Sequence, residues 1–262
     1  MSDTINTAQA VKQNIHEFGE SIIEISHLQK SFGDNHVLTD FNLHIRRGEN
    51  VVVLGKSGCG KSVLIKCIAG LLPYEGGSLK VFGKEIKDLK HKELDNMRAS
   101  IGFVFQSSAL YDSMTVRENL EFPLRRQKHG KSKQEVKKLI EETLENVGLL
   151  SAINLMPAEL SGGMRKRIGL ARSLVLEPEL MLYDEPTTGL DPFTAREISR
   201  LMLDMQHKYN TSSIIISHDM QCAKLTANRL AVMMDGINYA QGTYQELSQL
   251  NDPKIHAFFE NL

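Results

Sequence analysis

The sequence has no tryptophan and only three cysteines, Cys59, Cys67 and Cys222. These cysteines are scattered, with no CxxC pair and no His/Cys cluster. That spacing excludes a disulfide framework and a zinc site, and it is typical of a reducing compartment. A basic excess is also absent, because 31 Lys and Arg face 32 Asp and Glu, a formal net charge of −1. Dedicated nucleic-acid-binding proteins usually carry such an excess, so the balance argues against that class.

Long apolar runs are absent as well. Apolar segments such as Val51–Leu54 and Leu180–Leu182 are far too short to cross a bilayer. Residues 1–20 are polar and mixed in charge, without the apolar stretch of a secretory signal. A chain of 262 residues, 41% hydrophobic, suits one large domain or a core with an inserted lobe. We therefore expect a chain that does not span a membrane, with a polar N-terminal extension (1–20) before one domain (21–262).

Strand and helix patterns alternate along most of the chain. The run Glu49–Leu54 ends at a glycine turn that leads into a helix, Lys61–Gly70, which is the start of an α/β unit. From Ser107 to about Glu159 the pattern is helical, with a charged amphipathic segment at Lys131–Asn146. The sequence thus predicts an α/β fold with a helical lobe inserted into a parallel-sheet domain. The remaining predicted elements are strands at Ile22–Leu28, Val37–Ile45, Ile101–Phe105, Leu180–Tyr183, Ser213–Ser217, Arg229–Met234 and Gly236–Ala240, a helix at Pro192–His207 and short helices to Leu262.

The glycine turn before the first helix matches the phosphate-binding pattern G-x-x-x-x-G-K-[ST] in full. Its glycines let the backbone curl so that N–H groups converge on phosphates, and the positive end of the following helix adds to the attraction. We expect Lys61 to reach the β- and γ-phosphates of ATP and the Ser62 hydroxyl to ligate Mg²⁺. The predicted nucleotide-binding residues of this loop are Gly55, Lys56, Ser57, Gly58, Cys59, Gly60, Lys61 and Ser62.

Two carboxylates, Asp184 and Glu185, follow the apolar run Leu180–Tyr183. Because ligands bind at the carboxyl edge of open α/β sheets, both side chains are expected at that edge. Asp184 suits the coordination sphere of Mg²⁺, and Glu185 suits the general base that takes a proton from the attacking water. Alone, such a run is equally consistent with an acidic turn, but the upstream phosphate-binding loop favours a catalytic pair.

A second helix start of phosphate-binding character is formed by Ser161, Gly162 and Gly163. A lone Ser-Gly-Gly is more often a helix cap with a turn, and Ser161 is indeed a good N-cap. One γ-phosphate cannot easily use both helix starts of one subunit if they lie on different lobes. We therefore expect a head-to-tail dimer, in which each nucleotide is held by one subunit's loop and the other's Ser-Gly-Gly. The residues expected on one face of the helix are Met164, Ile168, Ala171 and Val175.

The order of these motifs resembles that of an ABC-type ATPase domain, over roughly residues 22–245. The resemblance implies a P-loop NTPase (RecA-like) fold, with a mostly parallel sheet core, an antiparallel β subdomain and an inserted helical subdomain. The implied boundaries are a nucleotide-binding core of residues 21–106 and 166–262 and a helical subdomain of residues 107–165. The motifs that carry the resemblance are the phosphate-binding loop, Gln106, Leu160–Met164, Asp184-Glu185, Gly189-Leu190-Asp191 and His218.

The resemblance also implies what four single residues do. Gln106 would lie near Mg²⁺ and the attacking water, and Asp191 in a loop that crosses the dimer interface beside the partner's site. His218 would contact the γ-phosphate, and Phe32 would stack on the adenine, where many relatives have tyrosine. Outside this ordered set, a lone glutamine or histidine is usually structural. The implied catalytic residues are thus Lys61, Gln106, Glu185 and His218, and the implied Mg²⁺ ligands are Ser62, Gln106 and Asp184.

Two stretches, FQSSALYDSMTVRENLEFPLR and ELSGGMRKRIGLARS, are similar to the ATPase of Mla/MCE-type phospholipid transporters. Met164, where most ABC domains have glutamine, points the same way. The resemblance implies an ATP-hydrolysing subunit on the cytoplasmic face of the inner (cell) membrane. It would be attached there to an integral permease, and helices of that permease would contact this chain near Gln106–Leu124. An MCE-domain protein would accompany the permease.

Two other functions stay open at this point. An ABC importer for amino acids or another polar solute would use the same ATPase residues. An ABC ATPase that acts on nucleic acid or ribosomes usually has two ATPase domains, long coiled coils or basic surfaces. This chain has one domain, no sustained heptads and no basic excess, which argues against a nucleic-acid partner. A nucleotide-binding scaffold without activity conflicts with the presence of Glu185.

Overall fold

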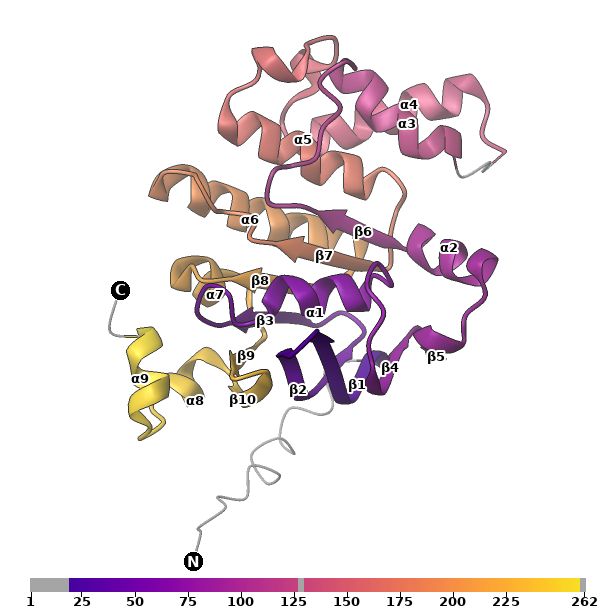
Figure 1. The fold of residues 1–262 in the computed structure, drawn as a ribbon. Helices are drawn as coiled ribbons and strands as arrows, with labels where there is room; N and C mark the ends of the chain where they lie inside the picture. The colour runs from indigo at the N-terminus through magenta and orange to yellow at the C-terminus, as the bar shows by residue number, and fades with distance from the viewer. Residues whose placement is uncertain (1–18, 127–129, 260–262) are drawn as a thin grey trace, which may run out of the picture.

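The computed structural model describes residues 19–126 and 130–259 (Figure 1). Residues 1–18 of the predicted N-terminal extension lie outside the described residues, as do 127–129 and 260–262. The strands are β1 (Ser21–Phe32), β2 (Asn35–Arg46), β3 (Asn50–Leu54), β4 (Gly76–Val81), β5 (Lys84–Glu85), β6 (Ile101–Val104), β7 (Leu180–Asp184), β8 (Ser212–Ser217), β9 (Arg229–Met234) and β10 (Ile237–Gly242). The helices are α1 (Lys61–Ile68), α2 (His91–Ala99), α3 (Val116–Arg126), α4 (Lys133–Asn146), α5 (Gly162–Leu174), α6 (Pro192–Tyr209), α7 (Met220–Thr226), α8 (Tyr244–Ser248) and α9 (Pro253–Phe259), with short 3₁₀ helices η2 (Ile86–Asp88), η3 (Leu150–Ala152) and η4 (Pro157–Glu159).

The strands of the described chain form one ten-stranded sheet in the order β5-β4-β1-β2-β10-β9-β3-β8-β7-β6. The five strands β9, β3, β8, β7 and β6 run parallel to one another, whereas β1, β2, β4 and β5 pair with one another in antiparallel fashion. β10 joins the two parts, because it pairs with β9 antiparallel and with β2 parallel. The predicted fold class, a mostly parallel core with an antiparallel β part, is confirmed.

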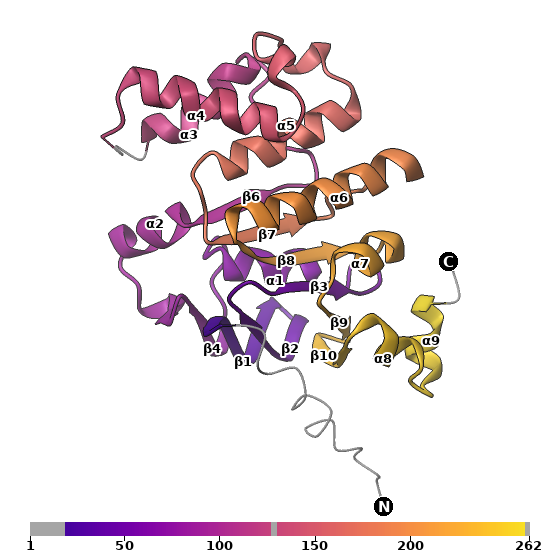
Figure 2. The ribbon, with the colours of Figure 1, turned by 180° about the vertical axis from the view of Figure 1, so that it is seen from behind.

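Each face of the parallel part of the sheet has its own apolar core. In β3 every residue is buried, which is typical of a parallel strand with both faces covered. Because side chains alternate along a strand, Val51 and Val53 pack in the cluster that includes α1, while Val52 and Leu54 pack in the cluster that includes α6. Figures 1 and 2 show α1 on one face and α6 and α7 on the other. The two cores fix the sheet edge at which β3 and β7 end.

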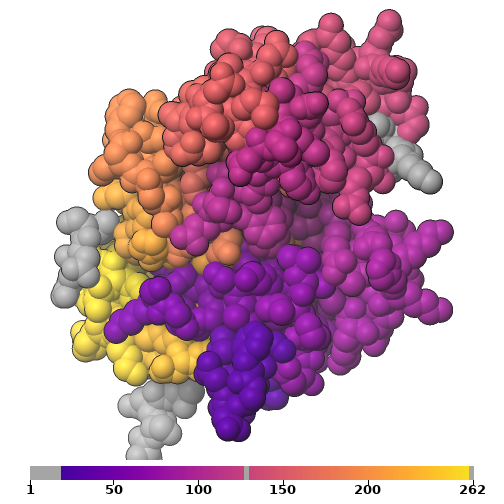
Figure 3. Space-filling model, turned by 45° about the horizontal axis from the view of Figure 1, so that its top comes forward, coloured from indigo at the N-terminus to yellow at the C-terminus, as the bar shows by residue number. Residues whose placement is uncertain are grey.

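Helices α3, α4 and α5 contact one another and form a separate lobe at the top of Figure 1. In the space-filling view, residues of this lobe form most of the upper part of the face shown, above residues of the N-terminal half (Figure 3). The predicted apolar face of α5 is confirmed, since Ile168, Ala171 and Val175 are fully buried and Met164 packs against them. Among the described residues, no helix is both long and apolar enough to span a membrane.

Some elements differ from the sequence prediction. Strands β4 and β5 and helix α2 were not predicted, because few of their residues are apolar and buried: Met97 is the buried residue of α2, and Leu79 and Val81 are those of β4. The helical pattern expected from Ser107 is wrong for residues 107–115, which form turns, and α3 begins only at Val116. The reason is local: Ser108 and Ala109 both have positive φ, which a right-handed helix excludes.

Candidate nucleotide-binding site

The loop between β3 and α1 is shaped by close contacts that exclude side chains. A Cβ on Gly55 would lie 2.5 Å from the Cys59 Sγ atom, and Gly60, with φ of 105°, lies directly before α1. Lys61 is buried, and its ammonium group donates to the carbonyl oxygens of Gly55, at 2.8 Å, and Lys56, at 3.1 Å. The loop therefore wraps around a positive charge at the N-terminus of a helix, which is an arrangement suited to phosphates.

Asp184, at the end of β7, faces the start of α1. Its carboxylate accepts a hydrogen bond from the Ser62 hydroxyl at 3.0 Å, and its side chain is buried. Burial raises the pKa of the Asp184 carboxyl, and the hydrogen bond from Ser62 opposes this shift. The hydroxyl and the carboxylate are oxygen donors of the kind that Mg²⁺ takes in phosphate sites.

The fit to Mg²⁺ can be tested on the donor set. Within the described ranges no group of three or more His, Cys, Asp or Glu could hold a metal ion. A metal at Ser62 and Asp184 would thus need further ligands from phosphate or water. That requirement matches Mg²⁺, which is usually held by one or two carboxylates together with substrate phosphates.

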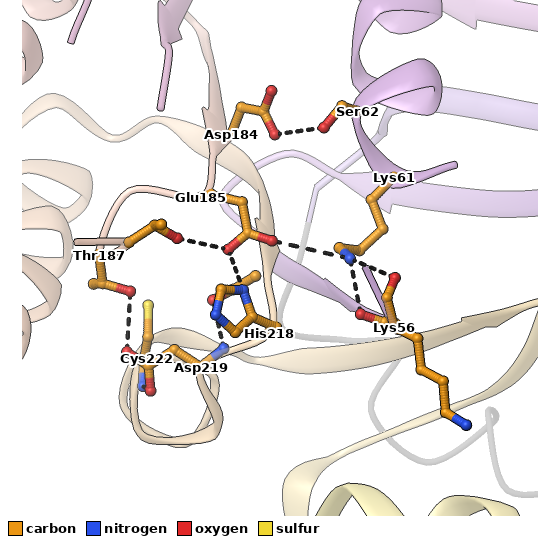
Figure 4. A network of polar contacts seen from close by, with 12 residues as sticks. Lys56, Lys61, Ser62, Asp184, Glu185, Thr187, His218, Asp219 and Cys222 are labelled. Carbon is orange, nitrogen blue, oxygen red and sulfur yellow. Dashed lines mark hydrogen bonds and ion pairs between the residues drawn. The ribbon is translucent and has the colours of Figure 1, made fainter. Parts of the chain in front are cut away.

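Glu185 lies next to these groups in a strained backbone conformation. Its φ is 50°, in the left-handed region that is unfavourable for a non-glycine residue by roughly 1–3 kcal/mol. One carboxylate oxygen lies 2.7 Å from His218 Nδ1 and accepts from the Thr188 hydroxyl at 3.1 Å, while the other lies 3.9 Å from Lys61 Nζ (Figure 4). Because a carboxylate can only accept, Nδ1 of His218 carries the proton in this contact.

The structure thus brings Lys61, Ser62, Asp184, Glu185 and His218 together at one edge of the sheet (Figure 4). The loop residues predicted to bind nucleotide lie at the same edge, and a cavity of about 450 Å³ beside them is lined partly by Gly55, Lys56 and His218.

Thr188 was not predicted, although it follows the acidic pair by three residues. A hydroxyl residue three positions after a carboxylate, in a turn, is the sequence signal that could have identified Thr188. Its neighbour Thr187 donates to Asp219 at 3.0 Å, and Asp219 in turn caps α7. These contacts join the turn after Glu185 to the segment between β8 and α7, which carries His218.

Ser161 and Asp191 lie elsewhere, at the starts of two neighbouring helices. The Ser161 hydroxyl caps α5 by accepting from the Met164 N–H at 3.2 Å, which confirms the predicted cap. The Asp191 carboxylate caps α6 by accepting from Phe193 and Thr194. A Cβ on Gly163 would lie 2.9 Å from Thr194, so the two helix starts are adjacent. In the part of the chain that is described, no hydrogen bond or ion pair joins these residues to the loop of residues 55–62.

Phe32 and Gln106 lie at element ends. Phe32 ends β1, is 49% exposed, and has the Lys30 ammonium 4.9 Å from its ring centre. Gln106 lies just beyond β6, and its backbone carbonyl accepts a hydrogen bond from Lys166 at 2.6 Å. The exposed ring of Phe32 is therefore accessible for stacking. Gln106 lies where the chain passes from the sheet to the helical lobe.

A parallel sheet, a loop that wraps a buried lysine, and a hydroxyl–carboxylate pair at the sheet edge define a nucleoside triphosphate-binding protein of the P-loop class. Comparison with known proteins narrows this class. The family model of the ABC transporter matches residues 38–188. The chain is 38% identical over 90% of its length to a probable ribonucleotide transport ATP-binding protein of Mycobacterium leprae, and 38% identical over 86% to a methionine import ATP-binding protein of Clostridioides difficile. It covers 68% and 70% of these two relatives, which are longer.

Solved structures agree. The ATP-binding cassette MJ0796, in a dimeric post-hydrolysis state bound to ADP and Pi, superposes with a TM-score of 0.77 at 30% identity, covering 84% of this chain and 98% of that one. The cbiO1 protein of Clostridium perfringens, part of the ABC transporter complex cbiONQ, superposes with a TM-score of 0.80 at 30% identity, covering 92% and 99%. The chain belongs to the ABC transporter family, and it is an ATP-binding, ATP-hydrolysing subunit of that family.

Proposed function

We propose that this ATPase powers a phospholipid transporter of the Mla/MCE type. The observation that carries the proposal is the pair of stretches around Gln106 and Ser161, which resemble the ATPase of those transporters and include Met164 in place of glutamine. The side chain of Met164 is half-buried and packs against the apolar core shared with the helical lobe.

The contacts of Glu185 support its assignment as the general base. His218 and Thr188 hold one of its carboxylate oxygens, which leaves the other to take a proton from water at the phosphate. Bonded to Glu185 through Nδ1, His218 presents Nε2 to the γ-phosphate. Lys61 neutralises the charge of the bound phosphates. When bound at Ser62 and Asp184, with Gln106 nearby, Mg²⁺ supplies charge that stabilises the leaving phosphates.

We propose further that two copies work head to tail. Ser161–Gly163 and Asp191 lie together but apart from the phosphate-binding loop of their own chain, so a second subunit would bring them to the nucleotide. A cassette of 30% identity was solved as a dimer, which supports the association of two copies. Closure of the dimer on ATP would move permease helices seated near Gln106–Leu124, and this contact would hold the chain on the cytoplasmic face of the inner (cell) membrane. The MCE-domain protein would accompany the permease.

Import of an amino acid or another polar solute is the second candidate. Relatives at 38% identity are named for methionine import and for probable ribonucleotide transport, and these names favour a polar substrate. The ATPase residues are the same in both cases, so the substrate must be read from the partner subunits.

The experiment is affinity purification of the full chain from gently solubilised native membranes, followed by mass spectrometry of the proteins and lipids that co-purify. We expect a multi-spanning protein, an MCE-domain protein and bound phospholipid. A multi-spanning protein together with a solute-binding protein, without MCE-domain protein, would replace the lipid proposal by the importer.

A further inference from the structure

The segment that follows Gln106 holds two consecutive residues in an unfavourable backbone conformation. Ser108 has φ of 64° and Ala109 has φ of 47°, and neither is glycine. Left-handed non-glycine residues persist only where the surrounding structure holds them, and they gather at functional sites. Ser108 is buried, so the strain lies inside the molecule, between the sheet and the helical lobe.

Helix α5 holds this segment at three points on one face. The Lys166 ammonium donates to the Gln106 carbonyl at 2.6 Å, and the Arg172 guanidinium donates to the Ala109 carbonyl. Between them, Gly169 packs so closely that a Cβ there would lie 3.1 Å from the Ser108 Cβ. Residues 166, 169 and 172 are spaced by three, so they share one side of the helix.

Burial makes both cations unusual. Lys166 is only 8% exposed, and burial lowers the pKa of its ammonium group, while the charge of Glu185 opposes this shift. Burial also lowers the pKa of Arg172, whose guanidinium lies 5.0 Å from the centre of the Tyr111 ring. A buried charge is costly unless it is paired and hydrogen-bonded. Among the described residues, both cations donate their hydrogen bonds to backbone carbonyls of one strained segment, which indicates that they hold that segment in place.

The far end of the segment is held by the same lobe. Asn119 of α3 is fully buried, accepts from the Tyr111 N–H at 2.8 Å and donates to the carbonyls of Tyr111, Met114 and Thr115 at 3.1, 3.0 and 3.1 Å. Residues 106–115 are therefore fastened to α5 at one end and to α3 at the other.

We infer that Lys166 and Arg172 are positioning residues, which lock the strained segment after Gln106 onto the helix that begins at Ser161. Gln106 and Ser161 then move as one rigid body. When the helix start at Ser161 meets the nucleotide bound by the partner, this movement sets the position of Gln106 at the nucleotide bound by its own chain. This inference rests on the proposed placement of Gln106 at the attacking water and of Ser161 at the partner's nucleotide.

The test compares Lys166→Met with Lys166→Arg in the full chain. Loss of the ammonium should let the segment relax and misplace Gln106, so kcat for ATP should fall by about tenfold to a hundredfold while KM changes little. Arginine should restore most of the rate, because it can still donate to the carbonyl. Lys138→Met, on the exposed face of α4, is the matched control and should behave like the parent.

A second readout separates positioning from a loss of stability. Hydrogen exchange of peptides from residues 106–115 should become faster in Lys166→Met, whereas β3 keeps its protection. Unchanged exchange in this segment, or a kcat within twofold of the parent, would overturn the inference. Gln106→Ala distinguishes a failure of the proposed role of Gln106 from a failure of the inferred role of Lys166. If Gln106→Ala leaves kcat unchanged, the proposed role of Gln106 is wrong. If Gln106→Ala lowers kcat but Lys166→Met does not, only the inference about Lys166 is wrong.

Discussion

Glu185 combines a strained backbone with a carboxylate held from three sides. Its left-handed φ turns the side chain back toward Lys61, and the contacts with His218 and Thr188 restrict its rotation. Strain of this kind is maintained where the surroundings over-determine it, as they do at active sites. At the scale of single residues, the site is thus pre-organised around Glu185, the residue that we propose as the base.

Glu185→Gln should retain ATP binding and lose turnover. The amide keeps the size of the side chain but cannot accept the proton from water, so kcat should fall by about a hundred- to ten-thousand-fold. Phosphate release measures the rate, and nucleotide binding is measured separately. Glu177→Gln is the matched control, because Glu177 is exposed and has nearly the same φ, 51°. A Glu185→Gln protein that hydrolyses ATP like its parent would refute the base assignment.

Asp184→Asn should raise the melting temperature of the nucleotide-free protein. The pKa of the Asp184 carboxyl is raised in the folded state, so folding penalises its charged form and stability is lost as pH rises through that pKa. Removing the charge should recover this stability at neutral pH, at about 2–4 °C per kcal/mol. The same variant should lose the further stabilisation that ATP with Mg²⁺ gives the parent. A lower melting temperature at pH 7, together with intact Mg²⁺-dependent stabilisation, would count against the buried-ligand account.

Pattern matching could predict the residues whose types are required by chemistry, such as Lys61, Asp184 and Glu185. It could not predict Thr188 or Lys166, because a threonine in a turn and a lysine on a helix are ordinary in sequence. Their significance comes from distances to Glu185 and Gln106 that only the fold creates.

At the scale of elements, the end of β1 depends on a charged clamp from the turn before β4. Lys30 is buried, and its ammonium donates to Glu75 at 2.7 Å. The other oxygen of Glu75 accepts from the Ser31 N–H at 2.8 Å, directly before Phe32. The hydrogen bond from Lys30, followed by that from Ser31, lowers the pKa of the Glu75 carboxyl. The clamp therefore holds the strand end that carries the exposed ring.

Glu75→Gln should lower the melting temperature at pH 7 and raise KM for ATP severalfold. The neutral amide leaves the Lys30 cation without its counter-charge and loosens the strand end under Phe32. Because the folded pKa of Glu75 is depressed, its contribution is present above the unfolded value of 4.5 and lost as pH falls through the folded one. The stability difference from the parent should thus shrink at acid pH.

Thermal melts at several pH values and ATPase kinetics measure both effects. Glu24→Gln is the control, because Glu24 forms a long, solvent-accessible ion pair with Lys80, at 3.8 Å. Equal losses in the two variants, or a difference that is the same at all pH values, would contradict the clamp.

Helices and strands could be predicted where their burial leaves a run or a regular spacing of apolar residues in the sequence. The fully buried strands β3, β7 and β8 could be read from their apolar runs, and α5 from its stripe. Helix α2 could not, since its one buried residue sets no period. The turn segment 107–115 resembled a helix in sequence because its backbone strain leaves no mark in composition.

At the scale of the whole molecule, the described chain carries two groups of residues that do not meet, which we propose as the two half-sites of a shared ATP site. The phosphate-binding loop, Asp184 and Glu185 form one, and Ser161–Gly163 with Asp191 form the other. Both groups could be predicted from the sequence, because phosphate-binding helix starts are recognisable locally, and the dimer that would join them stays a prediction. The lock that connects the two groups could not be predicted, since that depends on how the helical lobe packs on the sheet.

The most direct test of the central claim, ATP hydrolysis at sites shared between two subunits, mixes two inactive variants. Lys61→Ala destroys the first half-site and Ser161→Arg the second. A mixed dimer keeps one intact site, so random mixing should restore about one quarter of the parent ATPase rate if each site works independently. Lys61→Ala mixed with Glu185→Gln is the control, because both changes lie in the same half-site and should not complement. Recovery in the first mixture alone is the predicted result; no recovery, or equal recovery in both, would contradict the shared site.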